Sequence, residues 1–232
     1  METAPPRLAS FTSPEAESAE PVFAVADDVV VPRLDRQPTS PRARIVRELA
    51  IVGERAEAIW QLYHEAFEPL RELALQQHLW SREEILAELA NPRIVKFVGM
   101  SGDEPVGLCM VTNDLSAVPL ISPEFLRARY PEQAARDAIF YGIVIFVRAG
   151  YRGRTLFARL GTHAGQEAAS SCGVIVFDVC AFNREHASLD DNLRRLARSF
   201  PNSSMDLVDQ QSWFAIEVPE PLEDFSRLQV RR

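Results

Sequence analysis

Residues 139–182 read IFYGIVIFVRAGYRGRTLFARLGTHAGQEAASSCGVIVFDVCAF, and this stretch decides the fold. Its first nine residues, Ile139–Val147, carry no charge, and residues 174–182 carry only Asp178. Uncharged runs of this kind are typical of strands that are buried on both faces. Between them, apolar residues at helical spacing predict a helix over Leu156–Ala169. A strand, a crossover helix and a second strand predict a parallel pair.

Shorter elements extend this pattern on both sides. Toward the N-terminus the sequence predicts a strand at 44–51, a helical stretch at 54–78 that Pro69 divides, and a helix from Ser81 to Asn91. Strands at 94–100 and 106–111 predict a hairpin, and the insert at 116–137 is predicted to be a helical lid. Beyond the parallel pair we expect a helix at 190–200 and strands at 205–208 and 213–218. The order predicts an α/β (α+β) fold around one mixed sheet.

The length and composition limit the class of protein. At 232 residues and 26.0 kDa, we expect one domain with tails. With 47% apolar and 25% charged residues, wholesale disorder is excluded. No run approaches the roughly 18–20 apolar residues of a membrane span, and the N-terminal residues lack the pattern of a signal peptide, so we expect neither. A net charge of −8 argues against nucleic acid as a partner.

Composition also divides the chain. Seven of the sixteen prolines lie in residues 1–43, which we expect to be a flexible Pro/Ser-rich arm, with 22–31 as a stretch that could dock as an edge strand. We expect the folded domain to occupy residues 44–218 and a tail to occupy 219–232. The three cysteines, Cys109, Cys172 and Cys180, are an odd number in apolar surroundings, and they predict reduced core residues of a cytoplasmic protein.

Candidate ligand-binding residues concentrate in the loop between the first buried strand and the helix. Gly150 and Gly153 bracket a tight turn, and Arg152 and Arg154 lie where the helix begins. Together with these arginines, the unpaired N–H groups of a helix start suit a phosphate or pyrophosphate. The alternative is an Arg-Gly-Arg turn that serves solubility alone. The sequence has neither the Gly-Lys-Ser/Thr of a P-loop nor a Gly-x-Gly-x-x-Gly fingerprint.

From Val147 onward, the run Val-x-Ala-x-Tyr-Arg-Gly and the helix that follows resemble the acyl-CoA binding motif of the GNAT superfamily of N-acyltransferases. The element order from about residue 44 to 218 resembles the GNAT fold, which implies a mixed, mostly antiparallel sheet with a central parallel strand pair flanked by helices. In the family pattern (Gln/Arg)-x-x-Gly-x-(Gly/Ala), Arg152 matches, whereas Thr155 and Phe157 stand where small residues are expected. The ring of Phe157 either turns into the core or lies over the loop N–H groups, and we predict the inward position.

The resemblance implies a donor and a set of residues that bind it. The donor would be acetyl-CoA or another acyl-CoA, and no metal is implied. Loop N–H groups would hold the pyrophosphate, the end of the preceding strand would pair with the pantetheine arm, and an asparagine after the next strand would contact that arm. The residues implied are Ile145, Val147, Arg152, Gly153, Arg154, Thr155, Phe157 and Asn183.

Two side chains are candidates for proton transfer. Tyr141 is the only polar side chain of the run Ile139–Val147, and His186 lies three residues after Asn183. The alternatives are a pocket-lining role for Tyr141 and a surface or helix-cap role for His186. Asp178 either faces the cleft or caps the sheet rim. The tyrosine with which the family often protonates the leaving thiolate has no counterpart near residues 196–200.

The first helical region is rich in aromatic residues. Trp60, Tyr63, Phe67 and Trp80 either pack in the core or form a wall on the acceptor side, where the resemblance places this region.

The resemblance therefore predicts an N-acyltransferase that moves an acyl group from CoA to a small-molecule or peptide amine by direct attack in a ternary complex. The alternatives are a catalytically inactive GNAT-like binding or regulatory module, and an acyltransferase with a long-chain or carrier-protein-bound donor. A homodimer is left open.

Overall fold

The computed structural model describes residues 43–73, 79–118, 121–151, 155–186, 189–215 and 217. All of them belong to the second of two units into which the chain divides, Pro41–Arg232. The elements upstream of the crossover are β1 (Arg44–Glu48), α1 (Glu54–Phe67), α2 (Leu70–Leu73), α3 (Arg82–Ala90), β2 (Val95–Ser101), β3 (Glu104–Thr112), α4 (Pro123–Arg129) and α5 (Pro131–Ala134). From the crossover onward they are β4 (Ile139–Val147), α6 (Leu156–Ala169), β5 (Val174–Val176), α7 (Ala181–His186) and α8 (Leu189–Ala197).

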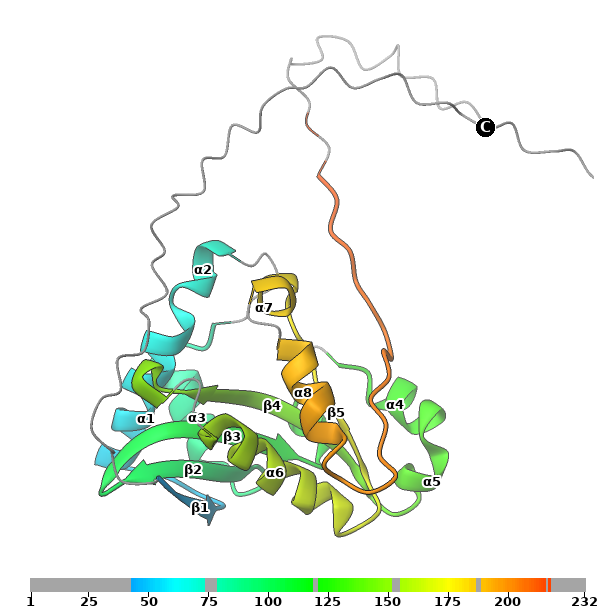
Figure 1. The fold of residues 1–232 in the computed structure, drawn as a ribbon, viewed down its shortest axis with the longest axis horizontal. Coiled ribbons are helices and arrows are strands. Elements are labelled where there is room, and N and C mark those ends of the chain that lie inside the picture. Colours follow the sequence, from blue (N-terminus) through cyan, green and yellow to red (C-terminus); the bar gives the residue numbers. More distant parts are fainter. Residues whose placement is uncertain are drawn as a thin grey trace, which may run out of the picture. The chain divides into compact units, whose positions relative to one another are not determined.

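The strands form one mixed sheet with the order β1-β2-β3-β4-β5 (Figure 1). The first three pairs are antiparallel, and β4 pairs with β5 in parallel, with Ile139 opposite Val174. The helix α6 crosses over between these two strands, as the sequence predicted. The predicted fold class, a mostly antiparallel mixed sheet with a parallel pair and flanking helices, is confirmed. The pair was predicted to be central, whereas β5 is the edge strand of the described sheet.

Helices cover both faces of the sheet. Figure 1 shows α6 and α8 on the near side of the strands, with α1 and α3 on the far side. One buried cluster joins α1 and α3 to the sheet and includes Ile59, Leu89 and Phe146. A second cluster joins α6 to the opposite face and includes Val147, Leu156 and Leu160. Because adjacent residues of a strand point to opposite faces, Phe146 and Val147 belong to different clusters.

Local signals in the sequence set the helix boundaries on the far side. The hydroxyl of Ser81 accepts a hydrogen bond from the N–H of Glu84, whose carboxylate accepts one from the N–H of Ser81, so α3 begins with a capping box. Pro69 separates α1 from α2, as predicted. The insert between β3 and β4 is helical, because Pro123 and Pro131 each lie in the first turn of a short helix.

A fully buried lysine joins three elements. Lys96 lies on β2, and its Nζ donates hydrogen bonds to the carbonyls of Leu49, at 3.0 Å, and of Asn91, at 2.5 Å. Leu49 follows β1, and Asn91 follows α3. Burial lowers the pKa of Lys96 to about 8, and the nearby carboxylate of Glu88 opposes this effect.

Two glycines let α8 approach α6 closely. A Cβ atom at Gly161 would lie 2.4 Å from Cδ2 of Leu196, and one at Gly165 would lie 2.3 Å from Cζ of Phe200. The glycines are four residues apart on α6, and their partners are four residues apart, with Leu196 in the last turn of α8 and Phe200 just after it. Because these two positions have no side chains, the surface of α6 is recessed there, and Leu196 and Phe200 pack into the recess.

The structure differs from the sequence-based expectation in three places. The strand predicted over 174–182 ends at Val176, and residues 181–182 belong to α7. The strands predicted at 205–208 and 213–218 are not formed by the residues described there, so β5 is the last strand in the order. The predicted burial of all three cysteines is wrong at Cys172, which is exposed in the turn after α6 with a φ of 50°. A tight turn places its side chain outward.

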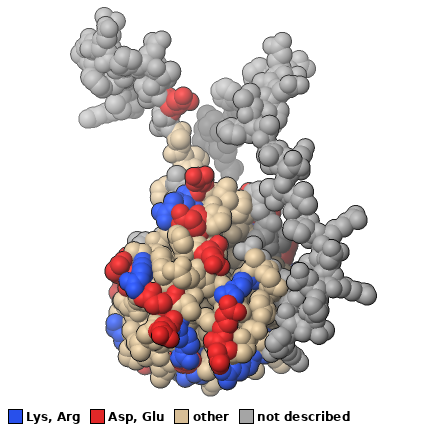
Figure 2. Space-filling model, turned by 90° about the vertical axis from the view of Figure 1, so that its left-hand side faces the viewer, with Lys and Arg blue, Asp and Glu red and all other residues tan. Residues whose placement is uncertain are grey.

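Several predictions fall on residues outside the described ranges, namely those for the arm at 1–42, for the end of the helical stretch at 74–78 and for the tail at 219–232. None of the described helices is both long enough and apolar enough to cross a membrane. On the face that Figure 2 shows, acidic and basic side chains lie among each other rather than in one large patch of a single sign.

Candidate functional site

The two parallel strands separate after three residue pairs. Residues 139–141 of β4 pair with residues 174–176 of β5, and the chain from 177 to 180 then leaves the sheet. β4 continues to Val147 with β3 along its other edge. On the edge that faces away from β3, residues 142–147 therefore have no strand partner in the described part of the chain, so backbone N–H and C=O groups are available there.

A β-bulge lies at this point of separation. In the pairing of β3 with β4, Met110 lies opposite Val144 whereas Val111 lies opposite Gly142, so Ile143 is an extra residue. A bulge turns the following side chains and bends the strand, and bulges are frequent next to active sites. Here it marks the start of the unpaired edge.

Tyr141 and Asp178 meet across the last residue pair of the parallel strands. The Tyr141 hydroxyl donates a hydrogen bond to the Asp178 carboxylate. Tyr141 is buried, and Asp178 is exposed. Burial, and then the charge and hydrogen bond of Asp178, raise the pKa of Tyr141 above its usual range. The hydroxyl thus keeps its proton and directs it toward the carboxylate.

The opposite end of the unpaired edge meets the start of α6. Ile145 is half-buried and Val147 is buried, and both belong to the cluster under α6. After β4 the chain makes a short 3-10 turn at Ala149–Tyr151, and α6 begins after Thr155, whose side chain is exposed. The predicted ligand-binding residues Arg152, Gly153 and Arg154 lie outside the described residues.

Phe157 lies in the first turn of α6. Its ring is partly buried and packs against the cluster that contains Val147 and Leu160. This is the side of α6 that faces the sheet. The N–H groups that begin α6 point along the helix axis, away from this contact.

Asn183 lies on α7, which follows the chain segment that leaves β5. It is half-buried. His186 ends α7, and its side chain lies outside the described residues. Among the described residues, no three His, Cys, Asp or Glu side chains are grouped in a way that could hold a metal ion.

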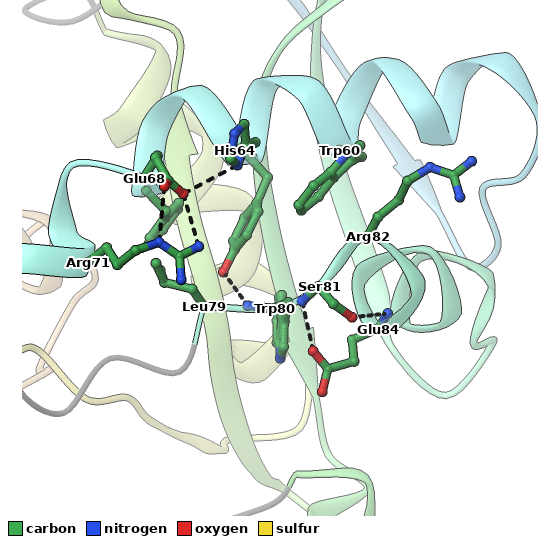
Figure 3. Close-up of a pocket in the computed structure, with 11 residues that line it drawn as sticks. Trp60, His64, Glu68, Arg71, Leu79, Trp80, Ser81, Arg82 and Glu84 are labelled. Carbon is green, nitrogen blue, oxygen red and sulfur yellow. Dashed lines mark hydrogen bonds and ion pairs between the residues drawn. The ribbon is translucent and has the colours of Figure 1, made fainter.

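A hollow lies beside α1. It has a volume of about 400 Å³ and is bounded by α1, α2 and residues 79–84 (Figure 3). Aromatic rings make up much of its wall. Tyr63 stacks on Phe67 at 4.7 Å and on Trp80 at 5.7 Å between ring centroids, and Trp60 stacks on Tyr63 at 6.0 Å.

Polar contacts fix this wall. The N–H of Trp80 donates to the Tyr63 hydroxyl at 3.1 Å, and burial raises the pKa of Tyr63. At the rim, the Arg71 guanidinium donates to both carboxylate oxygens of Glu68, at 3.0 and 3.1 Å, and His64 Nδ1 lies 3.5 Å from Glu68. The bonds from Arg71 lower the pKa of Glu68.

The structure thus brings together part of what the sequence predicted. Tyr141, Ile145 and Val147 lie along one strand, with Asp178 opposite its point of separation, and the four predicted aromatic residues form one wall. The sequence analysis did not identify Glu68, Arg71 and His64, which form the rim of the hollow. Their spacings of three and four residues are those of ion pairs on a helix, and this signal was available.

Comparisons with known proteins were made on sequence and on structure. No protein-family model matches the chain, and no curated protein matches it. Similar solved structures include an aminoglycoside acetyltransferase from an uncultured soil metagenomic sample, with 15% identity, 75% of this chain and 97% of that one covered, and a TM-score of 0.46. A ribosomal-protein-alanine N-acetyltransferase from Brucella melitensis biovar Abortus 2308 has 12% identity, 76% and 99% coverage, and a TM-score of 0.44. At these values the likeness assigns neither substrate nor activity to this chain.

Proposed function

We propose that this chain is an N-acyltransferase that moves an acetyl or other acyl group from CoA to an amine. The observation that carries the proposal is the separation of β4 from β5. It leaves an unpaired strand edge that runs from the Tyr141–Asp178 pair to the start of α6.

The unpaired edge suits the shape and chemistry of an acyl-CoA. The pantetheine arm carries two amide groups, so it can hydrogen-bond to the edge of β4 as an added strand would. Its pyrophosphate end would then reach the start of α6, where helix N–H groups and the arginines Arg152 and Arg154 favour an anion. Its thioester end would lie near Ile143 and the bulge.

The reaction is a direct aminolysis of the thioester. The amine nitrogen attacks the thioester carbonyl carbon, the new C–N bond forms, and the C–S bond breaks. The amine gives up a proton to a base, and the departing thiolate takes up a proton. Alignment of the thioester by backbone groups of β4 would supply the main rate enhancement, because it fixes the geometry and stabilises the developing oxyanion.

We assign the proton-accepting role to the exposed carboxylate of Asp178 and a positioning role to Tyr141. The raised pKa of Tyr141 makes its hydroxyl a poor acid toward a thiolate, because the pKa of a free thiol is about 8.5. Its hydrogen bond instead orients Asp178. His186 remains our second candidate for proton transfer, on the strength of its place at the end of α7.

Calorimetry with acetyl-CoA, longer acyl-CoAs and free CoA tests the proposal. The parent chain should bind all three groups of ligand, and Arg152→Ala should weaken binding by about 1.5–3 kcal/mol, the scale of a hydrogen bond to a charged group. Arg129→Ala, at the end of α4, is the matched control and should bind as the parent does. Unchanged affinity of a folded Arg152→Ala variant would remove the assignment of the phosphate loop.

Release of free CoA thiol in the presence of a panel of amines then separates an enzyme from a binding module. Asp178→Asn should lower kcat more than it changes the affinity for acetyl-CoA. Binding of CoA without any turnover would favour the non-catalytic alternative.

A further inference from the structure

The hollow beside α1 offers ring faces to a ligand. Trp60, Phe67 and Trp80 are each only partly buried, although they stand on the buried Tyr63. Figure 3 shows Trp60 on α1 and Trp80 beside the start of α3, and both rings line the hollow between these helices. Its volume of about 400 Å³ lies within the range of small-molecule sites.

The charged groups around this hollow already have partners in the protein. Glu68 is held by Arg71 and His64, as the dashed lines of Figure 3 show. Arg82 donates to both carboxylate oxygens of Glu57. Glu84 accepts the N–H of Ser81 at 2.7 Å. A ligand that depends on many hydrogen bonds would have to break these pairs, whereas one with a flat apolar body needs only the rings.

The hollow is joined to the proposed donor strand by aromatic packing. Phe146 of β4 meets Tyr63 edge-on at 5.9 Å and Phe67 edge-on at 5.6 Å. Its neighbours in the strand, Ile145 and Val147, belong to the segment whose free edge we assign to the pantetheine arm. A group seated on these rings is therefore one residue layer away from β4.

We propose that this hollow binds the flat apolar body of the amine acceptor, and that the acceptor class is a primary amine on an aromatic ring system. The proposal rests on the proposed function, because it takes the ligand to be the acceptor. The ring of the ligand packs against Trp60 and Trp80, and its ammonium group gains from the π-faces of these residues before it loses its proton. Amines without a ring lack this contact.

The test compares two probes that share an ammonium-ethyl unit, 2-phenylethylamine and ethanolamine. Emission of the tryptophans reports the binding, and the three of them are Trp60, Trp80 and Trp213. We expect a saturable change with 2-phenylethylamine and none with ethanolamine at the same concentrations. This comparison uses the parent chain and needs no variant.

Variants then locate the site. Trp60→Leu and Trp80→Leu keep an apolar side chain but remove the ring, and each should weaken binding of 2-phenylethylamine about five- to tenfold. Trp213→Leu is the matched control, because Trp213 is 57% exposed in the segment after α8, and its affinity should equal that of the parent. Circular dichroism checks that each variant is folded.

The outcome separates this inference from the proposed function. Absence of saturable 2-phenylethylamine binding, equal binding of ethanolamine, or equal loss in Trp213→Leu would overturn the inference, even if CoA binds. Ring-dependent binding at Trp60 and Trp80 in a chain that also binds CoA supports the inference. The same binding without CoA binding would show an aromatic-amine site in the hollow and would remove its role as the acceptor site.

Discussion

Phe157 lies in the first turn of α6, at a position where the GNAT pattern has a small residue. The ring packs against the cluster under α6, while the N–H groups of the helix start point elsewhere. We therefore expect Phe157→Gly to lower the free energy of unfolding by about 2–3 kcal/mol, since it removes a partly buried ring and places glycine in a helix. CoA affinity should not improve. Urea denaturation and calorimetry measure the two effects.

The matched control is Phe125→Gly on α4, where the ring is 47% exposed. This variant should lose only about 1 kcal/mol, mainly from helix propensity. A Phe157→Gly variant that binds CoA much more tightly, with little loss of stability, would show that the ring blocks the site.

The titration of Lys96 makes the free energy of unfolding depend on pH. The folded-state pKa of about 8 lies below the ordinary value of 10.5, so between these two pH values the folded state has lost a proton that the unfolded state still holds. Stability therefore rises with pH across this window, because the penalty for a buried charge disappears. The total change is about 3 kcal/mol.

Lys96→Met removes this titration and isolates it from that of other groups. The free energies of unfolding of the parent and Lys96→Met, measured in urea from pH 7 to pH 10.5, should differ by an amount that shifts in favour of the parent as the pH rises. A difference that stays constant over this range would mean that the lysine keeps its ordinary pKa in the folded protein.

At the scale of elements, local signals explain which boundaries the sequence could predict. The uncharged run of β4 and the periodic run of α6 matched the observed bounds, because burial on two faces and helical spacing leave direct marks in the sequence. The start of α3 is fixed by Ser81 and Glu84 within one turn. In contrast, residues 205–208 are apolar enough to predict a strand but pair with no described strand, because a short apolar run does not specify a pairing partner.

The close packing of Leu196 and Phe200 against the glycines of α6 cannot be predicted from the spacing of apolar residues in the sequence. At an exposed helix position, glycine to alanine gains about 1 kcal/mol. At Gly165 we expect a loss of about 1 kcal/mol instead, because the new Cβ would force the ring of Phe200 out of the recess. Thermal or urea denaturation measures the difference.

A double variant provides the control for Gly165→Ala. In a Phe200→Ala background the obstacle is absent, so Gly165→Ala should regain the stabilising sign of an ordinary helix position. If Gly165→Ala stabilises the parent and the Phe200→Ala variant equally, the ring of Phe200 does not pack against Gly165.

At the scale of the whole molecule, the candidate site depends on contacts that a linear reading cannot supply. Tyr141 and Asp178 are 37 residues apart, and their hydrogen bond depends on the register of the parallel pair. The sequence predicted both strands and left two roles open for Asp178. The aromatic wall likewise needs Trp80 to return to α1 from beyond α2.

The boundary of the folded unit can be tested by truncation. The carbonyl of Ala43 accepts a hydrogen bond from Arg159 at 2.6 Å, and Arg47 of β1 pairs with Glu167 of α6 at 2.6 Å. Deletion of residues 1–40 keeps both contacts and should leave the thermal midpoint within about 2 °C of that of the full chain. Deletion of residues 1–48 removes β1 and should lower the midpoint by about 10 °C or more. A large effect of the shorter deletion would show that the arm is part of the fold.

The strands lie in the sheet in the same order as in the chain. During synthesis on the ribosome, each new strand can therefore add to the edge left by the one before it, without waiting for a distant segment. The outer edge of β4 stays largely open even after β5 has been added, because β5 pairs with only three of its residues. An open strand edge on a nascent chain invites aggregation. Under the proposed function, a CoA molecule would lie along that edge and protect it, so the donor would also act as a folding ligand for newly made chains.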